Sequence, residues 1–121
     1  MTRAIYLSAS FFALSACALA AQTPWLFHDR HLETLPSGDT ALVLRFLDPD
    51  LATQSYADVA PRLDALCDGQ GREEWRALED VPDELVLVVM DRAVPRGTAD
   101  PQSTQYISAY RIDDVEGCIW Q

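Results

Sequence analysis

The two histidines of this chain lie in one short segment with charged neighbours, His28-Asp29-Arg30-His31-Leu32-Glu33. Imidazole and carboxylate groups are common ligands of zinc, so this segment is the candidate metal site of the sequence. On a strand, His31 and Glu33 would share one face while His28 would point to the opposite face. A metal would therefore need ligands from elsewhere, and the pattern favours a solvated strand end. We assign no metal and no cofactor.

Nucleophilic catalysis needs a nucleophile that is held beside a base. The sequence contains no Gly-x-Ser-x-Gly elbow, no His-Glu-x-x-His pair and no glycine-rich phosphate loop. A carboxylate pair would suit a glycosidase, but 19 acidic residues single out no pair. We assign no catalytic residue, and a small enzyme is the least favoured function.

The three cysteines, Cys17, Cys67 and Cys118, point to an exported protein with one disulfide. Leu14-Ser15-Ala16-Cys17 resembles a bacterial lipobox, in which Cys17 would be acylated, whereas Ala18-Leu19-Ala20 is an ordinary signal peptidase site. Either event leaves Cys67 and Cys118. In an exported domain these two favour a disulfide over a pair of buried thiols.

The N-terminal segment predicts export. Arg3 is followed by an apolar run, Ile5 to Ala16, which is shorter than the roughly 20 residues that span a bilayer. We expect residues 1–20 to be a cleaved signal and residues 21–121 to form one small domain. The expected location is the periplasm, with the protein either soluble or held on a membrane by a lipid on Cys17.

The charge of the chain excludes some partners. The 121 residues include nine arginines, no lysine and 19 acidic residues, and loss of Arg3 with the signal leaves a net charge of −11. Such a surface repels nucleic acid and anionic headgroups, so we expect no nucleic-acid partner and no membrane contact except through a lipid anchor. The charge suits either a basic protein partner or simple solubility.

The first half of the domain predicts a hairpin and a helix. Trp25–Leu35 and Thr40–Leu47 read as strands around the turn Pro36-Ser37-Gly38-Asp39. Ser55–Asp68 has helical spacing, with either Ser55 or Asp58 as the N-cap. Pro61 favours the later start because proline is tolerated only in the first turn, and Gly69 is the expected stop.

The second half predicts three more strands. A short helical turn over 72–78 precedes the apolar run Leu85–Met90, and a turn-rich loop leads to the alternating segment Gln105–Ile112. Gly117–Trp120 is a short last strand that carries Cys118. The order β-β-α-β-β-β predicts an α+β fold, a small antiparallel-rich sheet with one helix packed on one face.

One set of polar and aromatic residues is a candidate recognition patch at one end of this sheet: Asp91, Arg92, Gln105, Tyr106, Tyr110 and Trp120. Tyr, Trp and Arg dominate the hot spots of protein interfaces. The structural alternative, which we favour, is that Asp91 and Gln105 hydrogen-bond the loop between them while the aromatic rings fill the core.

The second half also carries a family resemblance. The residues concerned are Leu66-Cys67, Met90-Asp91-Arg92-Ala93-Val94-Pro95, Gly97, Thr104-Gln105-Tyr106, Ala109-Tyr110-Arg111 and Cys118-Ile119-Trp120. In these the chain resembles an uncharacterised family of small exported proteins of Gram-negative bacteria, a domain of unknown function. The resemblance implies the fold, export and the disulfide but no reaction. We therefore expect a non-catalytic binding or accessory module with a protein partner in the cell envelope. The alternative is an inhibitor of a basic envelope hydrolase such as a lysozyme-like enzyme.

Overall fold

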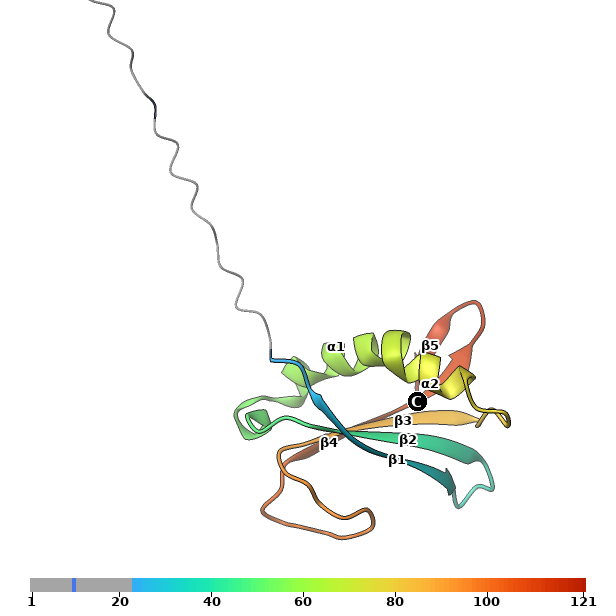
Figure 1. The fold of residues 1–121 in the computed structure, drawn as a ribbon, viewed down its shortest axis with the longest axis horizontal. Coiled ribbons are helices and arrows are strands. Elements are labelled where there is room, and N and C mark those ends of the chain that lie inside the picture. The colour runs from blue at the N-terminus through green and yellow to red at the C-terminus, as the bar shows by residue number, and fades with distance from the viewer. Residues whose placement is uncertain (1–9, 11–22) are drawn as a thin grey trace, which may run out of the picture.

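The structure is a computed structural model that describes Ser10 and residues 23–121. Cys17, both cleavage sites and all of the predicted signal except Ser10 lie outside the described residues. The described residues fold into five strands, one short 3-10 turn and one longer, kinked helical segment (Figure 1). The strands are β1 (Leu26–Thr34), β2 (Thr40–Leu47), β3 (Glu84–Met90), β4 (Gln105–Asp113) and β5 (Gly117–Trp120). The helical segments are η1 (Leu51–Thr53), α1 (Tyr56–Leu66), η2 (Cys67–Gly71) and α2 (Arg72–Arg76).

The strands form one sheet in the order β1-β2-β3-β4-β5. The β1–β2, β3–β4 and β4–β5 pairs are antiparallel, while β2 and β3 are parallel because the helical connection carries the chain back across the sheet. The predicted α+β class is confirmed. β2 and β5 have the predicted bounds, and the other three strands differ by one residue at one or both ends.

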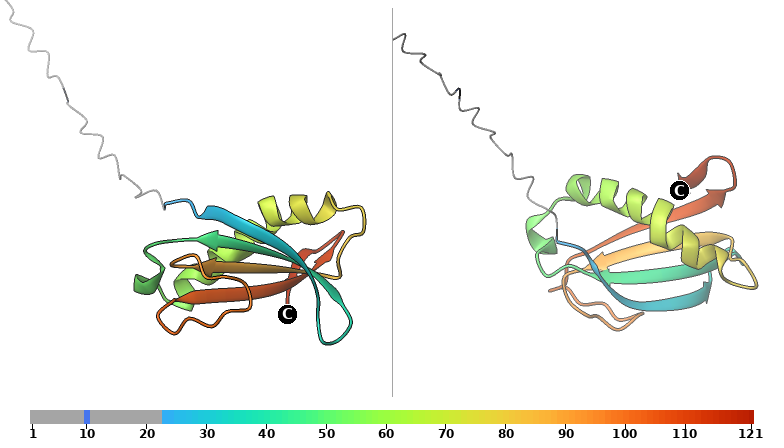
Figure 2. Two further views of the ribbon diagram at one scale, coloured as in Figure 1. Left: turned by 60° about the horizontal axis from the view of Figure 1, so that its bottom comes forward. Right: turned by 45° about the horizontal axis from the view of Figure 1, so that its top comes forward.

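The helix covers one face of the sheet, and the loop between β3 and β4 lies against the other face (Figures 1 and 2). Alternate residues of β2 and β3 face the helix and are fully or almost fully buried with its apolar side chains: Leu42, Leu44, Phe46, Leu85, Leu87, Val89, Val59 and Leu63. On β4, Ser108 and Tyr110 are buried on this side, as the predicted alternation requires. The sheet and helix therefore share one core.

The start of α1 confirms one of the two predicted caps. Ser55 is the N-cap, and its hydroxyl accepts from the Asp58 N–H at 3.2 Å while the Ser55 N–H donates to the Asp58 carboxylate at 3.0 Å. These bonds from Ser55 lower the pKa of the Asp58 carboxyl. The later start that Pro61 favoured is wrong, because Pro61 lies inside the helix, beyond its first turn.

Gly69 does not end the helical segment. It adopts non-helical angles (φ −99°, ψ −110°), and the chain kinks there and resumes as α2. Gly71 explains why the kinked segment can lie so close to the sheet. A Cβ atom at Gly71 would be 2.9 Å from Leu85 Cδ2 on β3 and 3.1 Å from the Leu66 carbonyl oxygen. Glycine permits this close approach of helix and strand.

Candidate functional site

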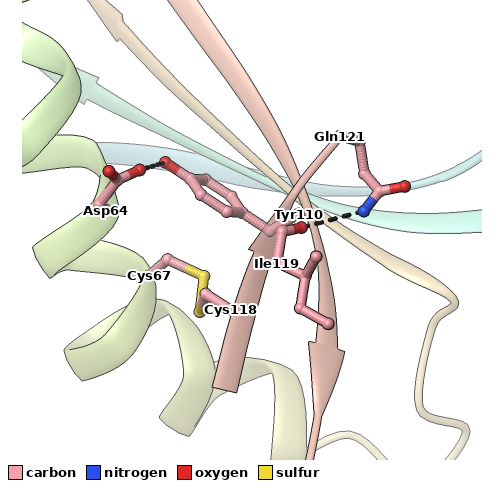
Figure 3. Close-up of a disulfide and its surroundings, with 6 residues drawn as sticks. All are labelled: Asp64, Cys67, Tyr110, Cys118, Ile119 and Gln121. Carbon is pink, nitrogen blue, oxygen red and sulfur yellow. Dashed lines mark hydrogen bonds between the residues drawn. A yellow bond between two sulfur atoms is a disulfide. The ribbon is translucent and has the colours of Figure 1, made fainter. Parts of the chain in front are cut away.

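The disulfide joins the helical layer to the last strand. Cys67, fully buried at the end of α1, is bonded to Cys118 of β5, with 6.3 Å between their Cα atoms (Figure 3). The predicted pairing is present. β5 has only four residues, and the cross-link ties this short strand to the helical layer in addition to its pairing with β4.

Tyr110 is anchored beside this disulfide. Its ring is 1% exposed, and its hydroxyl donates to Asp64 Oδ1 at 2.7 Å (Figure 3). Burial raises the pKa of the Tyr110 hydroxyl, and donation to the Asp64 carboxylate raises it further. Tyr110 is therefore a core residue and cannot reach a partner.

The six residues of the candidate patch do not lie together. Met90 pairs with Gln105 at one end of the β3–β4 ladder, so Asp91, Arg92, Gln105 and Tyr106 lie at or near this end. Tyr110 and Trp120 pair with each other at the opposite end. The expectation that all six converge is wrong, because β4 spans the length of the sheet between its first and last members.

At the first end, the polar residues hold the β3–β4 loop. The Asp91 carboxylate accepts from Ser103 Oγ at 2.9 Å and from the Thr104 N–H at 3.1 Å, and Arg92 Nη2 donates to the Gln102 carbonyl oxygen at 3.0 Å. Burial alone would raise the pKa of Asp91, but donation from Ser103 and Thr104 outweighs it and the pKa lies below its usual value. These contacts agree with the structural alternative for Asp91. Among the described residues, the Gln105 side chain makes no such hydrogen bond.

Trp120 differs from the other aromatic members of the patch because it is 65% exposed at the end of β5, whereas Tyr106 is half-buried and Tyr110 is buried. Two other exposed side chains lie nearby in the fold. Tyr56 at the start of α1 is 41% exposed and shares a hydrogen bond with Ser108 of β4 at 3.1 Å, and Ile107 of β4 is 54% exposed. Neither Tyr56 nor Ile107 was predicted as a recognition residue, because only the Tyr56–Ser108 hydrogen bond and the register of β4 place both beside the same stretch of this strand.

This edge is partly uncovered. β5 pairs with Tyr110–Asp113 of β4, and the Gln121 N–H donates to the Ala109 carbonyl oxygen at 3.0 Å. Within residues 23–121, no strand pairs with the outer side of Gln105–Ser108. We call this stretch, residues 105–108 of β4, the open edge.

On the sheet face opposite the helix, a buried arginine holds three parts of the chain together. Arg45 of β2 is 4% exposed; its guanidinium donates to both Asp29 oxygens on β1 and to the Val94 carbonyl oxygen of the β3–β4 loop. This contact lowers the pKa of Asp29 to about 2, against the opposing effect of burial. The sequence carries one signal for this contact, which is the presence of Arg45 inside the apolar run Thr40–Leu47. A buried charge needs a partner, so a charged residue in a buried strand indicates such a contact.

The histidines lie on either side of Asp29, and the prediction for His28 is wrong. His31 Nε2 is 3.1 Å and His28 Nε2 is 3.7 Å from Asp29 Oδ2, so both histidines reach the same carboxylate. The cause is a register shift between Phe27 and Asp29, where a bulge breaks the alternation of strand faces. Among the described residues, no group of three or more His, Cys, Asp or Glu side chains is arranged to hold a metal ion.

A second polar centre ties the segment before β1 to α1. Asp48 is 6% exposed; its carboxylate accepts from Trp25 Nε1 at 3.1 Å and from Gln54 Nε2 at 2.9 Å. The guanidinium of Arg62 lies 4.3 Å from the centre of the Trp25 ring. A shallow hollow of about 390 Å³ lies beside these groups, lined by Thr23, Asp48, Asp50, Gln54, Asp58 and Arg62. These contacts give Asp48 a structural role.

The carboxyl groups give little support to acid–base catalysis. Every described carboxyl group with a clearly displaced pKa is shifted downward: Asp29, Glu33, Asp58, Asp91 and Asp113. For Glu33 the main cause is a bidentate contact with Arg96 at 2.7 and 2.8 Å. A general acid at neutral pH needs the opposite shift, so these shifts belong to groups that hold the fold.

The fold and its contacts define a class: a small α+β domain with an open five-stranded sheet and a disulfide from the helical layer to the last strand. The chain belongs to DUF6497, a family of unknown function, whose model matches residues 10–121. The resemblance noted in the sequence, to a family of unknown function, is confirmed. Comparisons with curated proteins and with solved structures give no match.

No helix among the described residues is long and apolar enough to cross a membrane.

Proposed function

We propose that this protein is an exported protein of the bacterial cell envelope that acts as a non-catalytic binding or accessory module for a protein partner. The observation that carries the proposal is the open edge of β4 with exposed apolar side chains on either side, Ile107 on one and Tyr56 and Trp120 on the other. Isolated exposed apolar residues are ordinary, but a group beside unpaired strand is typical of a docking surface.

The envelope location rests on two features of the chain. Arg3 is followed by the apolar run Ile5 to Ala16, a pattern that is typical of export signals. The Cys67–Cys118 disulfide suits an oxidising compartment such as the periplasm. In the periplasm the protein is either soluble or held on a membrane through a lipid on Cys17.

A second candidate function follows from the charge. With 19 acidic and nine basic residues, the protein suits inhibition of a basic envelope hydrolase such as a lysozyme-like enzyme. Inhibition would then weaken as salt is added, because salt screens attraction between surface charges. If a basic lysozyme keeps its full activity at low ionic strength with excess protein present, this candidate is ruled out.

The test of the main proposal is partner capture in the native host. A C-terminal tag would follow Gln121 directly beside the open edge, so the tag belongs in the exposed β1–β2 turn at Ser37, on the far side of the sheet. Mild cross-linking in cells and mass spectrometry should recover one partner in stoichiometric amount. Recovery of the protein alone, at several cross-linker lengths, would contradict the proposal. The mass of the N-terminal peptide shows in the same experiment whether Cys17 is acylated or removed.

A further inference from the structure

The backbone of the open edge is oriented to accept another strand. In an antiparallel ladder, the N–H and C=O groups of one residue point to the same side, and successive residues alternate. The Ala109 carbonyl oxygen accepts from Gln121 on the β5 side. The N–H and C=O groups of Ile107 and Gln105 therefore also point outward, where no described strand pairs with them.

The side chains beside this edge differ on the two sheet faces. On the helix face stand Tyr56 and, at the end of β5, Trp120, while Ile107 projects from the opposite face. An added strand would place alternate side chains against these two surfaces. The β1 edge on the other side of the sheet is a poorer template, because it carries a bulge and the charged residues Asp29, Arg30 and Glu33.

The charges on the helix face favour a basic occupant. Asp64 lies on α1 above β4, where its carboxylate accepts from the Tyr110 hydroxyl, and the protein as a whole carries a net charge of −10. Among the described residues, Asp64 forms no ion pair. Arg111 of β4 already contacts Asp39 at 3.4 Å and Glu84 at 4.0 Å.

We infer that the open edge binds an extended, lysine- or arginine-bearing segment of a protein partner by strand addition. The segment runs antiparallel to β4, in line with β5, and pairs with Ile107 and Gln105. Its basic side chains face Asp64, and its apolar side chains pack on Ile107. The inference rests on the proposed binding function and names the surface and the chemistry of the partner.

A second copy of this chain is the competing occupant, since two β4 edges could pair around a two-fold axis. The net charge of −10 on each copy opposes that pairing. Self-pairing would show as a sedimentation coefficient that rises with protein concentration, together with slow hydrogen exchange at the Ile107 amide of the protein without peptide. That pair of results would overturn the inference.

The direct test uses a short synthetic peptide of alternating lysine and valine, added to the purified, disulfide-bonded protein and followed by amide NMR. We expect shifts at Gln105–Ala109 and at the Trp120 indole, with slowed hydrogen exchange at Ile107. A peptide that is N-methylated at the pairing positions should bind about tenfold more weakly or worse, because it cannot donate those hydrogen bonds. A glutamate–valine peptide should not bind.

Two variants with the same change of charge give the control. Ile107→Lys places a cation at the open edge and should abolish binding of the lysine–valine peptide. Val115→Lys adds the same charge in the β4–β5 turn, where Val115 is 93% exposed, and should bind like the wild type. Absence of binding at about 1 mM peptide, equal affinity for the N-methylated peptide, or equal loss in both variants would refute the inference. If Ile107→Lys still captures a partner in cells, the binding function stands and this surface is wrong.

Discussion

Removal of the disulfide should cost this domain a large part of its stability. The perturbation is the double variant Cys67→Ala and Cys118→Ala. The bond closes a loop between positions 51 residues apart, for which the chain-entropy model gives about 4 kcal/mol of free energy of unfolding. Cys67 is fully buried, so its truncation adds a small packing loss in the same direction.

The assay is urea denaturation followed by tryptophan fluorescence or circular dichroism. A domain of this size has a total free energy of unfolding of about 5–15 kcal/mol, so the double variant should be marginal at room temperature. Its melting temperature should fall by about 20 °C. Reductant should destabilise the wild type by a similar amount and leave the double variant unchanged. A loss under about 1 kcal/mol would refute the argument that the cross-link holds β5 and the helical layer together.

Three further outcomes follow from single substitutions. Asp29 has a pKa of about 2 against an ordinary 3.8, so its contact with Arg45 stabilises the fold by about 2 kcal/mol above pH 4. This stabilisation is lost as the pH falls towards 2, and urea denaturation at a series of pH values should show the loss in the wild type and not in Asp29→Asn. Pro61→Ala should raise the free energy of unfolding by about 1–2 kcal/mol in urea denaturation, because it restores a hydrogen bond inside α1. A lower free energy of unfolding would show that the stiffening of the unfolded chain by proline dominates. Gln105→Ala should leave the melting temperature within about 2 °C of that of the wild type, because the exposed Gln105 side chain has no hydrogen-bond partner among the described residues. A larger drop would give Gln105 a structural role.

The sequence predicted most of the elements because their local signals agree with the fold. Thr40–Leu47 is both rich in β-forming residues and buried on both faces, so β2 has the predicted bounds. Ser55 and Asp58 form a capping box whose spacing is visible in the sequence. The disulfide was predictable because loss or acylation of Cys17 leaves only Cys67 and Cys118 in an exported domain.

The errors arose where tertiary packing overrode a local rule. Pro61 is tolerated inside α1 because the buried face of the helix, with Val59 and Leu63, stabilises it more than the missing hydrogen bond costs. Gly69 bends the helical segment without ending it, since Gly71 then packs directly on Leu85. The bulge that brings His28 to Asp29 leaves no clear trace in the sequence.

The candidate patch failed for a different reason. Its members were grouped by residue type and by their position at strand ends, but the register separates Asp91 from Tyr110 by the length of β4. Asp91 serves the loop and Tyr110 serves the core, as the structural alternative expected. Of the three aromatic members, Trp120 alone is exposed, and the open edge beside it depends on how far β5 pairs with β4.

The most direct test of the binding function is site-specific photo-cross-linking in cells. A photoreactive phenylalanine analogue replaces Trp120 beside the open edge in one strain and Arg30 on the opposite edge strand β1 in another. Our account predicts an adduct of one discrete mass from position 120 and none from position 30, with equal amounts of folded protein in both strains. No adduct at position 120, or the same adducts at both positions, would contradict it.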